Sequence, residues 1–163
     1  MSAPVSSTKH LSCREATGAL ALVTANVEPS YEMVALTCGG PGFTSFGQAY
    51  GMSTGISPVS ITPRMRLDSV IHRLEKLPMG GTDCALPMRW AAKTRTPVDS
   101  FVIYTDNESW AGDVHVDQAL RDYRQRMGID AKLVSVALSG DRFTVSNPDD
   151  AGQLDVVGFD AAT

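Results

Sequence analysis

Oxygen-bearing side chains that could bind a metal ion follow one predicted turn and one predicted strand in this chain. Thr82 and Asp83 come directly after a Gly-Gly turn, and Asp106 comes directly after a predicted strand, ahead of Asn107-Glu108-Ser109. Hydroxyl and carboxylate oxygens at such positions suit a hard cation such as Mg²⁺, which takes few protein ligands and keeps several waters. Threonine and aspartate also suit helix caps and turns. The pattern therefore leaves two interpretations open, a cation site or local capping.

Other catalytic or binding motifs are poorly supported by the residue types and their spacing. The segment after Asp106 fails the calcium-loop template because Trp110 occupies the third ligand position. The chain contains neither G-x-S-x-G nor a P-loop, and its histidines share no ligand spacing. Asp149 and Asp150 could act as an acid and a base, but their place after an Asn-Pro pair favours a turn. The sequence therefore predicts a protein that is not an enzyme.

The charge balance gives little support to a nucleic-acid-binding domain that works alone. The 163 residues carry 14 Lys and Arg against 18 Asp and Glu, a net charge of −4, whereas such domains are usually basic. One small basic surface is predicted on a helix, at Arg121, Arg124 and Arg126, and is a candidate contact for RNA or a protein partner. Because Asp117 and Asp122 interrupt it, an ordinary solvated helix face is the alternative interpretation.

The hydrophobic pattern predicts helices that alternate with strands. Helices are expected over residues 9–26, 62–77, 85–93 and 115–127, the second capped by Thr62 and the last ended by Gly128. Strands are expected over residues 31–38, 43–48, 100–105, 132–138 and 154–157, with loops over 50–60 and 139–153. Strands that are apolar on both faces predict a single doubly wound α/β domain over residues 1–163, with a mostly parallel sheet. Ligands bind such folds at the carboxyl ends of the strands.

The cysteines and the apolar runs predict a cytoplasmic protein with no membrane contact. Cys13, Cys38 and Cys84 are widely spaced and form no C-x-x-C motif, which is typical of a reduced intracellular protein. Neither a signal peptide nor an apolar run long enough to span a bilayer is found.

Three stretches of the sequence carry a family resemblance. They are GGTDCALPMRWA (80–91), FVIYTDNESWAGDVHVDQALRDYRQRMGIDAKL (101–133) and FTVSNPDDAGQLDVVGFD (143–160). Together with the predicted first helix, they resemble the von Willebrand factor A domain of the Ro ribonucleoprotein (TROVE) family over nearly the whole chain. The resemblance implies a doubly wound fold and a domain of an RNA-binding ribonucleoprotein. In that family a helical-repeat ring, absent here, carries most of the RNA contact.

The resemblance also implies a metal-ion-dependent adhesion site, of which this chain carries a part. Thr82 matches the family's threonine ligand and Asp106 its aspartate ligand. The D-x-S-x-S motif that supplies the other ligands is absent from the chain. The expectation is therefore a degenerate site, at which Mg²⁺ or another divalent cation binds weakly.

The resemblance predicts that the domain is truncated at both ends. Met1 aligns just after the D-x-S-x-S motif, so the first strand of the family is expected to be missing, and the family's last helix lies beyond residue 163. That first strand lies between the strands expected at 31–38 and 101–105. Its neighbours could close up, another chain could donate a strand, or the fold could be marginal. The alternative function is a protein-interaction module of another assembly, and a metal-assisted hydrolase using Asp106 and Asp149 is a distant third.

Overall fold

The computed structural model describes residues 3–5, 10–49, 51–78, 81–106, 112–139 and 145–158. Its helices are α1 (Cys13–Val27), α2 (Leu67–Glu75), α3 (Leu86–Thr94) and α4 (Val116–Met127). Its strands are β1 (Val34–Thr37), β2 (Thr44–Ala49), β3 (Met52–Pro58), β4 (Ser100–Thr105), β5 (Lys132–Ala137) and β6 (Gln153–Val157). None of the helices in these ranges is long and apolar enough to cross a membrane.

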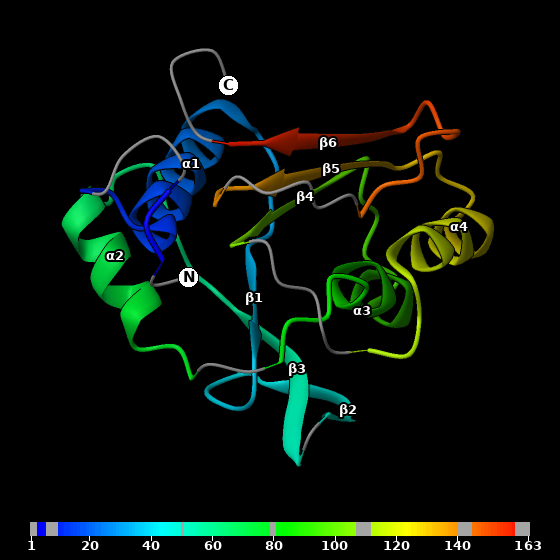
Figure 1. Ribbon diagram of the computed structural model, residues 1–163, viewed down its shortest axis with the longest axis horizontal. Coiled ribbons are helices and arrows are strands. Elements are labelled where there is room, and N and C mark those ends of the chain that lie inside the picture. The colour runs from blue at the N-terminus through cyan, green and yellow to red at the C-terminus, as the bar shows by residue number, and fades with distance from the viewer. Residues whose placement is uncertain are drawn as a thin grey trace.

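The strands form two separate three-stranded sheets (Figure 1). One sheet has the order β1-β3-β2 and is antiparallel, and the other has the order β4-β5-β6 and is parallel. Within the described residues, β1 pairs with β3 alone and β4 with β5 alone, so each strand has one open edge. The two strands expected to flank the family's first strand, β1 and β4, are therefore not paired with each other.

The open edge of β4 can be assigned residue by residue from its bonds to β5. The carbonyls of Asp99 and Thr105 accept backbone hydrogen bonds from the N–H groups at the two ends of β5, each at 2.9 Å. Because successive residues of a strand direct their backbone groups to opposite edges, Val102 and Tyr104 direct theirs away from β5. An extended segment entering at this edge would find donors and acceptors in the spacing of a strand.

One face of the parallel sheet is covered by α3 and α4, and the other is covered in part by α1, with Val102 on that second face 48% exposed. Phe101 and Ile103 of β4 pack against α3 and α4, in a core that includes Met88 and Leu120. Tyr104, which alternation places on the opposite face, packs with α1. The predicted α/β class and its doubly wound arrangement are confirmed.

Helix α1 packs against both sheets. Cys13 and Ala16, in its first half, lie with residues of β4 and β5. Ala21 and Ala25, in its second half, lie with Ala35 of β1 and with the chain that leaves β3. The helix begins later than residue 9, at Cys13, because Ser12 and Glu15 form a reciprocal capping box.

The predicted loop over residues 50–60 is wrong, because β3 occupies Met52–Pro58. The glycine, serine and proline content of β3 resembles that of a loop, but its proline and one of its glycines occupy positions that suit them in the sheet. Pro58 lies opposite Val34 at a position where the ladder needs no N–H group, as the bond from Val59 to Met33 at 2.8 Å implies. Gly55 lies where a Cβ atom would collide with the carbonyl oxygen of Thr44.

The helix predicted from Thr62 begins five residues later, at Leu67. Thr62 instead opens a turn in which its carbonyl accepts from Met65 N at 3.0 Å, and Arg66 occupies the N-cap position without a side-chain cap bond. Leu67 is 42% exposed whereas Val70 is fully buried, so the predicted apolar stripe reaches the core only from Val70 onward. Gly128, with φ of 68°, ends α4 as predicted.

Replacement of Gly55 by alanine is expected to lower the free energy of unfolding by about 2 kcal/mol, the range of overpacked sites. The added Cβ would meet backbone of β2 and the ring of Phe43, and the backbone cannot move aside without breaking the ladder. Gly39→Ala is the matched control, because a Cβ at Gly39 meets nothing within 4 Å. Urea unfolding of both variants measures the difference, and equal midpoints would contradict this assignment of β3.

Candidate functional site

The carboxyl end of β4 holds the first of the predicted cation ligands. Asp106 follows the last residue of β4 directly, and its backbone carbonyl accepts a hydrogen bond from Ser139 Oγ at 2.6 Å. The bond ties the end of β4 to the turn after β5, so the two strand ends lie together as the parallel pairing requires. Asn107-Glu108-Ser109 and Trp110 lie outside the described residues.

The second predicted ligand, Thr82, lies in the segment that leads into α3, next to a buried aspartate. Asp83 is 3% exposed, and its carboxylate accepts from Ala85 N at 2.9 Å and lies 3.9 Å from Arg89. Burial raises the pKa of Asp83, against the opposing effects of the Ala85 N–H and the Arg89 guanidinium. Asp83, the neighbour of the predicted ligand, therefore provides a cap for this turn.

The donor set for a metal at these strand ends is small. Among the described residues, no group of three or more His, Cys, Asp or Glu side chains is placed to hold a metal ion. Thr105 Oγ1, at the end of β4, is buried and has no hydrogen-bond partner in the described structure. Such a buried hydroxyl calls for an explanation, and a further segment at this end of the sheet would provide one.

The three arginines predicted as a basic surface have three different environments. Arg124 is only 19% exposed, and donates to Asp150 at 2.5 Å and to the carbonyl of Ala131 at 2.8 Å. Arg121 pairs with Asp117 at 2.6 Å on the outer side of α4. Arg126 alone of the three lines the hollow between α3 and α4. Arg124 therefore has a structural role. Of the three arginines, only Arg126 lines a concave surface.

Arg124 belongs to a polar network that fastens α4 to the turn before β6. Gln153 Nε2 donates to Asp117 at 2.7 Å and to Asp150 at 2.9 Å. Hydrogen bonds from Arg124 and Gln153 lower the pKa of Asp150 from 3.8 to about 2. Asp149 lies in the turn, where its N–H donates to the side chain of Asn147 at 3.0 Å. The predicted interpretation of Asp149 and Asp150 as turn residues fits these contacts.

A groove of about 500 Å³ lies between β2, α3 and α4, and is called here the α3–α4 groove. Three cations from two helices line it, Arg89 and Lys93 of α3 and Arg126 of α4, together with one acidic residue, Asp122. Phe46 of β2 lies among them, with Lys93 Nζ 5.2 Å and the Arg89 guanidinium carbon 5.7 Å from its ring centroid. Both distances are those of cation–π contacts.

Sequence reasoning missed this groove because its members are far apart along the chain. Phe46 and Arg126 are separated by about half of the 163 residues, and only the fold brings β2 against α3. One signal was present. Arg89 and Lys93 stand four residues apart in a helix that the sequence did predict, so they had to share a face.

The parallel sheet, the antiparallel sheet and the helices packed on them define a domain of the von Willebrand factor A type. The crystal structure of the Ro protein of Deinococcus radiodurans superposes with a TM-score of 0.80 at 38% identity, covering 98% of this chain and 29% of that one. The model of the Ro60 vWA domain family matches residues 1–163. The chain belongs to that family.

Two curated relatives carry the name RNA-binding protein RO60. The protein of Deinococcus radiodurans is 48% identical over 112 residues, which are 69% of this chain. The protein of Caenorhabditis elegans is 34% identical over 157 residues, which are 96% of this chain. The matched residues are 21% and 22% of those relatives, so this chain spans about a fifth of their length.

Proposed function

We propose that the chain is the non-enzymatic A-type domain of a Ro-like RNA-binding ribonucleoprotein in the cytoplasm. The observation that carries this proposal is the family match over residues 1–163. The relatives are named for RNA binding and are several times longer than the match. Most of the RNA affinity is therefore assigned to a helical-repeat ring, and this domain adds a smaller contribution.

The non-enzymatic role is supported by what the candidate acids and bases contact. Asp150 is paired with Arg124, and Asp83 caps the turn before α3. A general base must reach a substrate proton, and a carboxylate already holding a structural hydrogen bond is poorly placed to do so. The hydrolase alternative also needs a nucleophile or base beside Asp149, whereas the hydrogen bond that the Asp149 N–H donates to Asn147 belongs to the turn.

The cation site is proposed to be weak, because the chain supplies one carboxylate, Asp106, and one hydroxyl, Thr82, of the five ligands expected. Mg²⁺ gives up its waters reluctantly, so isothermal titration should find no affinity tighter than about 1 mM, below the sensor class. Asp106→Ala should leave the titration unchanged. A micromolar site that this substitution abolishes would overturn the proposal of a degenerate site.

Association of the chain with RNA can be tested by cross-linking in the cells that express it. A tagged chain, cross-linked by ultraviolet light and purified under denaturing conditions, should carry more RNA than a tagged control protein of equal size and charge. Equal recovery of RNA from both would refute the proposed function. In solution, the acidic chain should lose its weak affinity for single-stranded RNA at physiological salt, because few phosphate contacts are available.

A second candidate function, a protein-interaction module, is favoured by the open edges of β1 and β4. Each offers backbone donors and acceptors to an extended segment, which is how strand addition joins proteins. A partner that donates a strand would be recovered with the tagged chain in a purification under native conditions, without RNA. Its contact should be lost when proline replaces Val102, because the edge then lacks an N–H group.

A further inference from the structure

We infer that the α3–α4 groove binds a segment of single-stranded RNA, with phosphates held by Lys93 and Arg126 and a base resting against Phe46. The inference deepens the proposed function and rests on it, since it names where on this domain RNA would be contacted. None of the lining residues of the groove belongs to the predicted cation site, although one of them, Arg89, lies 3.9 Å from Asp83, next to Thr82.

The charge of the groove favours an anionic occupant. Its lining includes three cations and one carboxylate, on a chain whose overall charge is negative. Arg89 is already committed to Asp113 at 3.6 Å and Asp83 at 3.9 Å. None of the ion pairs found among the described residues involves Lys93 or Arg126. Two cations in one concave surface therefore have no carboxylate partner among the described residues, and Lys93 lies against the ring of Phe46.

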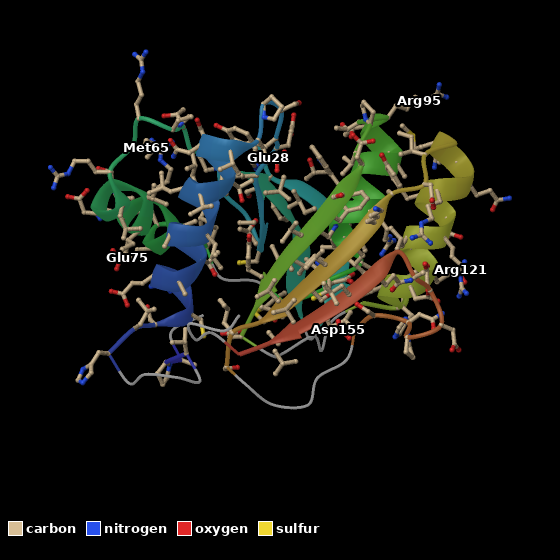
Figure 2. All side chains as sticks on the ribbon, turned by 90° about the horizontal axis from the view of Figure 1, so that it is seen from above. Glu28, Met65, Glu75, Arg95, Arg121 and Asp155 are labelled. Atoms are coloured by element: carbon tan, nitrogen blue, oxygen red, sulfur yellow. The ribbon has the colours of Figure 1, made fainter. Side chains whose placement is uncertain are left out.

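The positive surface continues past the groove. A neighbouring hollow of about 280 Å³ is lined by Arg95, Arg126 and Met127, so Arg126 borders both depressions. Arg95 follows the last residue of α3, and Figure 2 shows it at that end of the helix, away from Arg121 on α4. Because Arg126 is shared by the two hollows, an extended strand that crosses both would meet Lys93, Arg126 and Arg95, several cations of the kind that phosphate tracking uses.

The aromatic ring distinguishes RNA from an acidic peptide. Phe46 lies on β2, an edge strand, and its ring is only partly buried. A ring bordered by cations is the combination that single-stranded nucleic acids use, since every base has a face that stacks and every nucleotide a phosphate. An acidic peptide would satisfy the cations, but the exposed part of the ring, beyond its contacts with Arg89 and Lys93, would find no stacking partner. We therefore choose RNA, and the peptide becomes an outcome of the test.

The test measures fluorescence anisotropy of a labelled oligouridine of about 12 nucleotides with the 163-residue chain at low salt, about 50 mM, where phosphate contacts are strongest. The double variant Lys93→Glu/Arg126→Glu reverses the two available cations. Arg64→Glu/Lys76→Glu is the matched control, with the same change in charge at exposed residues outside the groove. Phe46→Leu removes the ring, and Lys93→Gln/Arg126→Gln serves if the reversed charges prevent folding.

The groove variant should weaken binding at least tenfold more than the control, and should reduce the salt slope by about two phosphate contacts. Phe46→Leu should weaken binding about tenfold with the slope unchanged, the effect of losing one stacked base. Equal losses in groove and control variants, or no binding by the wild type, would overturn the inference. So would equal affinity for an oligoglutamate peptide that is insensitive to Phe46→Leu. If RNA still cross-links to the chain in cells, the proposed function survives that failure; if it does not, both fall.

Discussion

Adding an upstream strand that carries D-x-S-x-S is expected to raise the melting temperature of this chain by about 10 °C. The strand would pair with the open edges of β1 and β4 and join the two sheets into one. About four net hydrogen bonds at about 1 kcal/mol each account for a gain of this size in a domain of this length. The same segment would add ligands beside Thr82 and Asp106, so the melting temperature should also become dependent on Mg²⁺.

The state of association gives an independent measurement of the same prediction. Open strand edges promote pairing between chains, so the 163-residue chain should associate in light scattering, and the extended chain should be a monomer. An extension of equal length with prolines in place of the strand residues is the control, and it should change neither property. If both proteins were monomeric and equally stable without any effect of Mg²⁺, the gap between β1 and β4 would not be the site of a strand.

Replacement of Arg124 by methionine is expected to cost about 2 kcal/mol of folding free energy, less than for a fully buried ion pair, because the two side chains are 19% and 21% exposed. The substitution leaves Asp150 and the carbonyl of Ala131 without their donor, and it loosens the turn before β6 from α4. Asp150→Asn, which keeps a side chain able to accept hydrogen bonds, should cost less. Arg66→Met, at an exposed pair with Asp68, should leave the unfolding midpoint unchanged.

The Arg124 prediction has a pH dependence whose sign follows from the lowered pKa of Asp150. The folded state holds this carboxylate ionised down to about pH 2, whereas the unfolded state protonates it near 3.8. The contribution of the pair is therefore complete above pH 3.8 and is lost as the pH falls toward 2. The difference in unfolding free energy between the wild type and Arg124→Met should shrink over that window. If the difference in unfolding free energy stayed constant over that window, the loss of stability in Arg124→Met would come from packing of the arginine side chain and not from the ion pair.

The parallel half of the fold was predictable from the sequence because each of its elements carries its own signal. Residues 100–105 are consecutive β-formers between polar residues, and β4 occupies those residues. Gly128 supplies the left-handed conformation that ends α4. The antiparallel half was not predictable in the same way. The sequence of β3 contains Gly55 and Pro58, whose places in the sheet depend on the neighbouring strands β1 and β2.

The candidate site, like the fold, could be predicted from the sequence only in part. Asp106 could be placed from local pattern, because it directly follows the best strand. The different environments of Arg121, Arg124 and Arg126 could not be predicted from the sequence. Their spacing on one helix does not reveal that Asp150, far along the chain, pairs with Arg124. Phe46 gave no signal at all, since an aromatic residue in a short strand is ordinary until α3 is packed beside it.

The contact of α1 with both sheets bears on how the molecule unfolds. No backbone ladder joins the sheets in the described structure, so their cooperation depends on packing, in which one half of α1 serves each sheet. A helix of 15 residues has little stability without tertiary support. Opening of either sheet would expose half of α1 and fray the helix toward the other half. Amide hydrogens of α1 should therefore exchange with solvent at the rate set by whichever sheet opens more readily.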